Sequence, residues 1–272
     1  MRNATVKKAA LLVLLIMVVL GIAYPALAPF HPDDFSFPAL LPPGGKHLLG
    51  TNKMGQDIFS ALLAGFRVTI SIALIVSFCS TLIGTALAVS CAFFRHWVDR
   101  FIMRVTEIFI IVPEIIVIML FAAFAGPKVA DVVMVMIFFS WSRITRILRG
   151  KAMVIINQDT VQYTLLLKGN LLDVGRKMWP YFYPAVTTLF IQQCGRAAVY
   201  EATLSFLGIG DPALKSWGRT IRAALDYEGI FWDHTYLWWL LPPILCLVLF
   251  VLALALLTFD FDEESESAER SE

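Results

Sequence analysis

Long apolar stretches separated by short polar segments dominate the chain. Six of them are continuous rather than alternating, at residues 9–29, 69–93, 101–125, 129–147, 180–206 and 237–259. An α-helix needs about 20 apolar residues to cross the hydrocarbon core of a bilayer. Continuous runs also favour helices over the alternating strands of a membrane β-barrel. The pattern therefore predicts an all-α polytopic membrane protein with six transmembrane helices, of which the fourth has the shortest apolar core.

The composition agrees with a protein that lies in a lipid bilayer. Of the 272 residues, 58% are hydrophobic and 16% are charged, against roughly 25% charged residues in a typical soluble domain. The formal net charge is +1, so there is no basic surplus of the kind that indicates a nucleic-acid partner.

The distribution of Lys and Arg predicts the orientation of the spans. If the N-terminus is cytoplasmic, fourteen of these residues fall in inside segments, Arg143 among them, and seven in outside segments, while Arg196 falls within a span. Short cytoplasmic segments are enriched in Lys and Arg. We therefore expect both termini to be cytoplasmic.

The first apolar stretch has an alternative interpretation. Lys7 and Lys8, the apolar run and the Ala-Leu-Ala sequence at 26–28 are also typical of a secretory signal peptide with its cleavage site. The run is longer than a usual signal core, however, and Pro29 directly after the cleavage position disfavours cleavage. We expect the first span to be retained.

The polar segments divide the chain into three parts. Residues 1–68 hold the first span and an outer segment, whose part at about 55–67 has helical apolar spacing and predicts an amphipathic helix at the outer interface. Residues 69–259 form the main transmembrane domain. Residues 260–272 are acidic with almost no apolar content, and we expect them to be disordered.

The longest cytoplasmic connection, at about 150–179, is both basic and apolar. Its middle reads Leu165-Leu166-Leu167, and Pro180 and Pro184 follow at what we expect to be the first turns of the next span. A helix at about 159–173 would carry an apolar face, and the sequence holds no other cytoplasmic domain to cover it. The connection therefore predicts a cytoplasmic partner protein.

Three sequence elements together resemble one known family. LGTNKMGQDIFSALLAGFRVTIS, from Leu49 to Ser71, is similar to its LGTDxxGRDxxSRLxxGxRxSL element. YEATLSFLGIG from Tyr200, followed by SWG at 216–218, is similar to EAALSFLGLG…SWG, and WVDRFIMRVTEIFIIVP from Trp97 resembles WxDxxxMRxxDxxxxxP. In order and spacing they resemble the permease subunits of ABC importers of the peptide/nickel type, specifically the C-type permease of dipeptide and oligopeptide systems.

The resemblance implies a six-span ABC type I importer permease fold in the cytoplasmic (inner) membrane of a bacterium or archaeon. It implies as partners a second homologous permease, two cytoplasmic ABC ATPases and an extracytoplasmic substrate-binding protein. The implied cargo is a di- or oligopeptide. A nickel or metal-chelate importer is the alternative, because these subfamilies share all three elements.

The sequence itself contains no catalytic constellation and no GxxxxGK[ST] phosphate-binding loop. We therefore expect a transport subunit rather than an enzyme. No cofactor would be bound by this chain, since ATP and Mg²⁺ would lie on the ATPases. The four histidines are scattered, and no metal site is predicted.

The resemblance also implies which residues contact the ATPase. The family's coupling helix carries EAARALG, where this chain has the segment Tyr163, Thr164, Leu165, Leu166, Leu167, Lys168 and Gly169. The glycine matches, but leucines replace the small residues, so we expect a wider apolar groove on the ATPase. The end of the sixth span also lacks the family's LGDxLRD. Loss of coupling is the alternative.

Ionisable residues within spans are costly and are candidates for the translocation path: Glu107, Glu114, Arg196 and Glu201. The first two are seven residues apart, which would place them on one face of a helix. As a structural alternative, Arg196 would pair with Glu114 or Glu201 and fix the packing, and Glu107 would reach the cytoplasmic interface beside Arg104.

Overall fold

The computed structural model describes residues 2–125 and 128–269, and side chains within 5–124 and 128–258. This part of the chain is helical, with two isolated β-bridges, which confirms the all-α prediction. Its elements are α1 (Arg2–Leu27), α2 (Ile58–Phe94), α3 (His96–Ile111), α4 (Glu114–Ala125), α5 (Val129–Ile155), α6 (Asp159–Leu166), α7 (Leu171–Phe206), α8 (Trp217–Leu225), the 3-10 helix η1 (Thr235–Leu237) and α9 (Leu241–Glu269).

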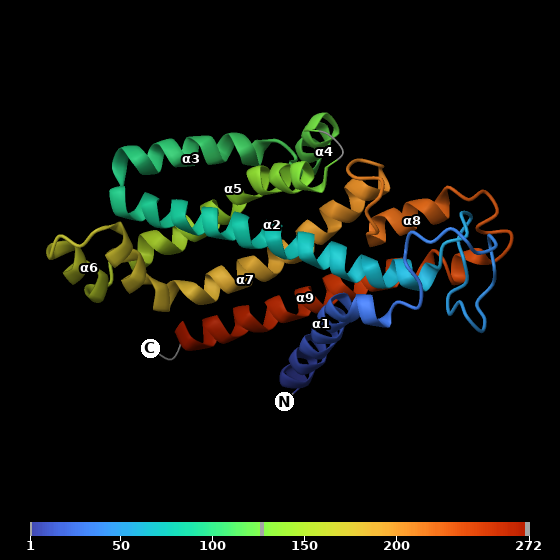
Figure 1. Ribbon diagram of the computed structural model, residues 1–272. Helices are drawn as coiled ribbons and strands as arrows, with labels where there is room; N and C mark the ends of the chain where they lie inside the picture. The colour runs from blue at the N-terminus through green and yellow to red at the C-terminus, as the bar shows by residue number, and fades with distance from the viewer. Residues whose placement is uncertain (1, 126–127, 270–272) are drawn as a thin grey trace.

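Helix α2 is the centre of the bundle. It packs along α5 and α7, and α1 covers another of its sides, while α9 lies against α7 and α1 (Figure 1). Its residues Ala73, Val76, Ala88 and Cys91 are fully buried. Such small and medium side chains allow neighbouring helices to approach closely, which is how helices associate when lipid is the solvent.

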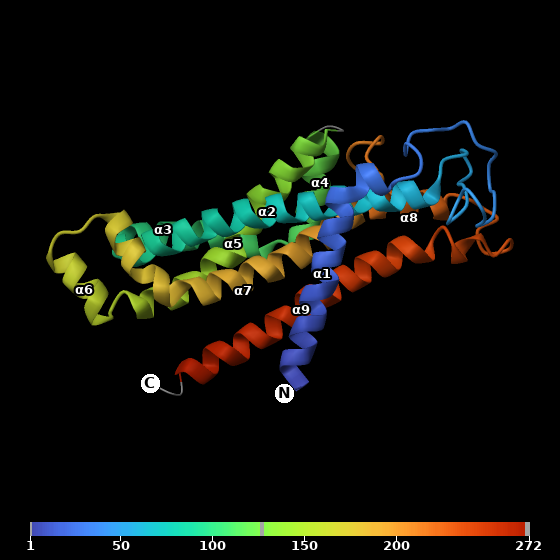
Figure 2. The same ribbon diagram turned by 60° about the horizontal axis from the view of Figure 1, so that its bottom comes forward.

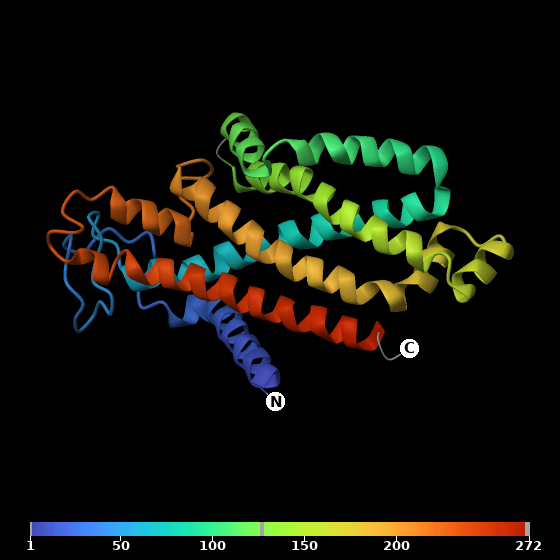
Figure 3. The same cartoon turned by 180° about the vertical axis from the view of Figure 1, so that it is seen from behind.

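The bundle is elongated, with different elements at its two ends. Helix α6 lies at one end, and the loop at 28–57 lies with α8 at the other (Figure 1). The same separation is seen after rotation in Figure 2, where α1 crosses over α9. Seen from behind, α7 runs between α5 and α9 (Figure 3). We call the α6 end the coupling end and the opposite end the outer cap.

Among the described residues, three stretches are long and apolar enough to cross a membrane: Thr5–Leu27, Ile58–Phe94 and Thr235–Thr258. The bent pair α3–α4 makes a fourth if it counts as one span. Helices α5 and α7 match the predicted fourth and fifth spans but carry several charged residues. Their crossing of the membrane, and so the count of six, stays a prediction.

The third predicted span, 101–125, is wrong as one continuous helix. Helix α3 ends at Ile111, α4 begins at Glu114, and the two are bent by 85°. Between them Val112 is extended, with φ −84° and ψ 134°. Pro113 causes this, because proline lacks an N–H and disfavours the helical conformation of the residue before it. Glu107 and Glu114 therefore do not share a helix face.

The predicted amphipathic helix at 55–67 is also wrong as a separate interfacial element. The segment is the first part of the continuous helix α2, and nearly every residue from Ile58 to Phe66 is buried. The reason is tertiary: the outer cap and α8 cover the side that we expected to face the interface.

The connection between α5 and α7 is shorter than predicted. Helix α6 covers 159–166 rather than 159–173, because the chain turns at Lys168, which has a φ of +57°. Helix α7 already begins at Leu171, where Asn170 and Asp173 form a capping box. Pro180 and Pro184 consequently lie inside α7 and not in its first turns.

The acidic tail also differs from the disorder that we expected. Helix α9 continues through this segment to Glu269, and 270–272 lie outside the described residues. Glu and Ala are good helix formers, and extending an existing helix avoids the cost of nucleation.

Candidate functional site

The first family-like element folds the outer cap. Gly50 and Gly55 have φ of +71° and +78°, a backbone region that strongly favours glycine. A Cβ on Gly50 would collide with the carbonyl oxygen of Leu41, and one on Gly55 with that of Phe37. These glycines therefore hold the loop at 28–57 in one fold.

Asp57 connects this loop to α2. Its carboxylate is fully buried and accepts hydrogen bonds from the Ser60 backbone N–H (2.8 Å) and the Ser60 hydroxyl (2.7 Å), which makes it the N-cap of α2. The other oxygen lies 2.9 Å from Nδ1 of His47. A carboxylate at a helix N-terminus satisfies exposed N–H groups and favours the helix dipole.

The second family-like element joins α2, α7 and α8. Gly65 of α2 and Gly218 of α8 stand where a side chain would strike Trp217 and Ala202, respectively. Glu201 of α7 is 2% exposed and accepts hydrogen bonds from the hydroxyls of Thr69 (3.1 Å) and Ser205 (2.7 Å). Glu201 therefore lies in a packed junction, where it forms hydrogen bonds but no ion pair with the residues that the structure describes.

The outer cap consists of the loop at 28–57 and the segment around α8, and these two parts are bound to each other. Lys215 forms an ion pair with Asp33 at 3.0 Å, and Lys53 donates a hydrogen bond to the carbonyl of Asp226 at 3.2 Å. Below them, Ile58 and Trp239 belong to one buried apolar cluster. The cap is thus a single folded surface rather than two independent loops.

At the coupling end, α6 has one buried and one exposed side. Val161 is fully buried, in a cluster with Ile156 and Val174, and Leu165 packs against that cluster. Leu166 is 75% exposed and Leu167 is 83% exposed, and Tyr163 is also exposed. The predicted coupling residues therefore divide into an anchor, Leu165, and an uncovered apolar row.

The end of α6 is a tight turn that needs Gly169. The Gly169 N–H donates to the carbonyl of Thr164 at 2.9 Å, and the Lys168 N–H to that of Leu165 at 3.0 Å. A Cβ on Gly169 would lie 2.7 Å from Cγ2 of Thr164. The glycine thus sets the position of the leucines just before it.

The four ionisable candidates do not form one cluster. Glu107 is 47% exposed and forms an ion pair with Arg104 at 3.1 Å, in agreement with the interfacial alternative. Glu114, at the start of α4, accepts hydrogen bonds from the Ser140 hydroxyl (2.6 Å) and from the Tyr200 hydroxyl (3.2 Å).

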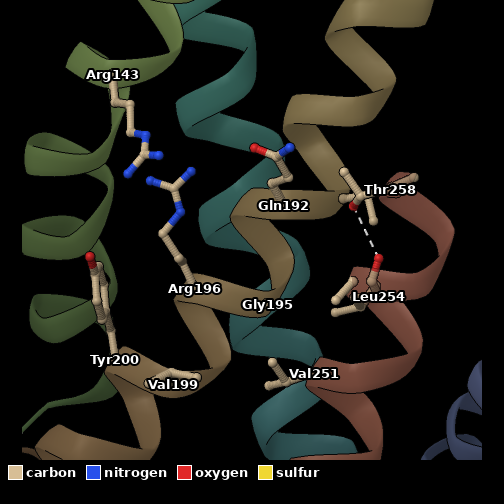
Figure 4. A pocket seen from close by; sticks show the side chains of 11 residues that line it. Arg143, Gln192, Gly195, Arg196, Val199, Tyr200, Val251, Leu254 and Thr258 are labelled. Atoms are coloured by element: carbon tan, nitrogen blue, oxygen red, sulfur yellow. Dashed lines mark hydrogen bonds between the residues drawn. The ribbon is translucent and has the colours of Figure 1, made fainter. Parts of the chain in front are cut away.

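Arg196 forms no ion pair with Glu114 or Glu201 among the described residues, so the predicted pairing is wrong. It lies instead in a cavity between α5, α7 and α9, and Arg143 of α5 lines the same cavity (Figure 4). Sequence reasoning missed Arg143 because it was counted as a cytoplasmic residue. Arg143 lies twelve residues before the end of α5, and this position can be recognised only when the bounds of the helix are known.

No group of three or more His, Cys, Asp or Glu side chains that could hold a metal ion is found in the described part of the chain. The described structure thus has an apolar surface suited to docking at one end, a folded cap at the other end and a cationic cavity between them.

The sequence is similar to known transport proteins. The sequence pattern described as "Binding-protein-dependent transport system inner membrane component" matches residues 80–262. The glutathione transport system permease protein GsiD of Pectobacterium atrosepticum is 27% identical over 246 residues, 88% of this chain and 80% of that protein. A Brucella suis protein named as a peptide transport system permease is 29% identical over 246 residues, 89% of this chain and 81% of its own length.

Proposed function

The chain belongs to the family of binding-protein-dependent transport system inner membrane components, and from that premise we propose that it imports di- or oligopeptides as the permease subunit of an ATP-driven ABC importer. Membership makes it a transport subunit of the inner membrane, not an enzyme, and implies ATPase and substrate-binding partners. The peptide cargo is supported by the names of its relatives. They give no support to the nickel alternative.

The proposed assembly contains this chain, a second homologous permease, two cytoplasmic ATPases and a binding protein outside the membrane of a bacterium or archaeon. Both termini would be cytoplasmic, and ATP with Mg²⁺ would be held by the ATPases alone. The outer cap would receive the binding protein.

The observation that carries the proposal is the uncovered apolar row at the end of α6, which consists of Tyr163, Leu166 and the C-cap residue Leu167. An apolar patch at the tip of a helix is typical of a surface that docks into a partner. The row lies at the end of the bundle opposite the outer cap (Figure 1). An ATPase groove would cover it there.

The attachment of α6 explains how movement would be transmitted. Val161 and Leu165 fasten α6 to the core, and the Gln162 side chain donates to the carbonyl of Ile156 at 2.9 Å. The adjacent helix α7 is continuous over 36 residues, roughly 54 Å at the rise of an α-helix. A displacement of α6 by the ATPases would therefore tilt a helix that reaches both the cavity and Glu201.

The test is co-purification of the ATPases with a tagged chain from gently solubilised native membranes. The double substitution Leu166→Asp and Leu167→Asp places charge on the docking surface, and we expect the ATPases to be lost because unpaired charges oppose burial. Leu165 is left unchanged, since its contacts with the core support folding.

Leu48→Asp is the matched control, because Leu48 is 60% exposed and belongs to the outer cap. This variant should retain the ATPases at the wild-type level. Mass spectrometry of the retained proteins identifies the second permease and the binding protein. Full recovery of ATPases with the double variant would exclude docking through α6.

A further inference from the structure

The cavity around Arg196 holds two cationic groups in an apolar setting. It has a volume of about 430 Å³ and lies where α5, α7 and α9 meet, within the 300–1,000 Å³ typical of small-molecule sites. Val199, Val251 and Leu254 supply apolar wall (Figure 4). A cavity of this size and lining would hold a small molecule with both apolar and charged parts.

The two guanidinium groups point toward one another from different helices. Arg143 projects from α5 and Arg196 from α7, and their heads lie side by side in Figure 4. Neither forms an ion pair with a carboxylate among the described residues. Arg143 is exposed and Arg196 is half-buried, so water weakens the repulsion between the two like charges without removing it.

The nearest acidic group offsets only part of this charge. Glu114 interacts electrostatically with Arg196, but its two oxygens accept hydrogen bonds from Ser140 and Tyr200. Two guanidinium groups and one carboxylate leave one positive charge. A single monovalent anion between the arginines would balance it.

The donor geometry favours a carboxylate in that position. Guanidinium groups are planar and bind carboxylates through two parallel N–H bonds. Gln192 also lines the cavity, and its side-chain amide has no hydrogen-bond partner among the described residues. Thr258 is less available, because its hydroxyl already donates to the carbonyl of Leu254 at 3.1 Å.

We propose that this cavity binds the C-terminal carboxylate of a peptide in transit, between Arg143 and Arg196, with the peptide's side chains against Val199, Val251 and Leu254. The inference rests on the proposed peptide import and adds a substrate subsite to it. The net charge of the cavity makes it specific for one carboxylate. A peptide whose C-terminus is amidated lacks the required charge and binds weakly.

The test uses the whole importer without its binding protein, in lipid nanodiscs, so that only the membrane subunits bind ligand. The probes are alanine peptides of two to five residues and their C-terminal amides. We expect the free acids to bind at least tenfold more tightly than the amides. Arg196→Gln and Arg143→Gln should each weaken binding of the acids about tenfold and abolish the preference for acid over amide.

Two further variants separate binding from folding. Arg196→Lys keeps the charge but loses the planar fork, and we expect it to keep part of the preference. Arg146→Gln removes an exposed arginine one turn from Arg143 that does not line the cavity, and it should bind as the wild type does. Equal binding of acids and amides by the wild type would overturn the inference.

ATP-driven uptake of the same peptides into vesicles, with the binding protein present, tests the proposed function separately. Normal uptake with no preference for the acid would leave peptide import standing and exclude the carboxylate subsite. A preference that depends on Arg196, without uptake of any peptide, would retain an anion site and exclude peptide as cargo. Anionic lipid could instead co-purify with the wild type and be lost from both Gln variants. If the wild type then also showed no preference for the acid, the cavity would be assigned to lipid and the inference overturned.

Discussion

Gly65 of α2 lies directly against the indole ring of Trp217 in α8, so closely that a Cβ on the glycine would overlap Cδ1 of the ring. Trp217 is fully buried and also contacts Phe66 and Phe250, with ring centroids at 5.0 and 6.1 Å. The indole thus joins α8 to the bundle, and the glycine makes room for it.

Gly65→Ala should lower the free energy of unfolding by about 1–3 kcal/mol, because the added methyl group displaces a ring that has no free space. Unfolding in mixed detergent micelles measures this. Gly150→Ala is the control: no atom lies within 4 Å of a Cβ there, and alanine is the better helix former. A Gly65→Ala variant as stable as Gly150→Ala would show that α8 is not held by this contact.

Asp57→Ala should cost about 2–4 kcal/mol of stability, because it removes the N-cap of α2 and leaves buried partners at His47 and Ser60 unsatisfied. The loss should loosen the outer cap first, which hydrogen exchange of residues 38–60 would detect. Asp34→Asn, an exposed change in the same loop, should leave exchange at 47–60 unaltered. Unchanged protection with Asp57→Ala would contradict a capping role.

Glu201→Gln should leave both stability and transport close to the wild type, because the amide oxygen can accept from one of the two hydroxyls and the amide N–H group can donate to the other. Glu201→Leu should destabilise the protein by about 1–3 kcal/mol, since both hydroxyls would remain buried without an acceptor. Peptide uptake and detergent unfolding are measured on both variants. Loss of uptake in a stable Glu201→Gln variant would assign the carboxylate to the translocation path instead.

The ion pair between Asp99 of α3 and Arg149 of α5 should contribute about 1 kcal/mol of coupling. It is bidentate, with Nε–Oδ1 and Nη2–Oδ2 distances of 2.9 and 2.6 Å, and partly buried. A double-mutant cycle of Asp99→Asn with Arg149→Gln measures it, because each change removes one of the two charges. The exposed pair of Arg104 and Glu107 serves as the reference cycle and should give a coupling near zero.

Apolar patterning predicted the helices well and their partners poorly. The run at 69–93 lies in α2 and most of the run at 237–259 lies in α9, because burial in lipid and burial in a protein core select the same side chains. The helical fold follows from residue type, whereas the exposure of Leu166 and Leu167 was expected because no other cytoplasmic domain in the sequence could cover them. Pro113 was visible in the sequence, but an apolar run on both sides of it concealed a bend of 85°.

The cationic cavity could not be predicted in this way. Arg143 lies beside Arg196 only because α5 and α7 are rotated about their axes in a particular way. Neither the apolar periodicity nor the count of charges predicts the relative rotation of two helices. Glu201 was recognised as ionisable, but its partner Thr69 lies 132 residues away in the sequence. Long-range side-chain pairing is decided by packing.

The bend between α3 and α4 also limits what can surround the protein. The last carbonyl groups of α3 have no helical N–H ahead of them, since the chain turns away at Val112 and Pro113. Acyl chains donate no hydrogen bonds, so within a bilayer these oxygens would need donors from protein side chains or water. If the pair α3–α4 is one span, the elbow is therefore a place on the bundle surface that lipid alone would not solvate.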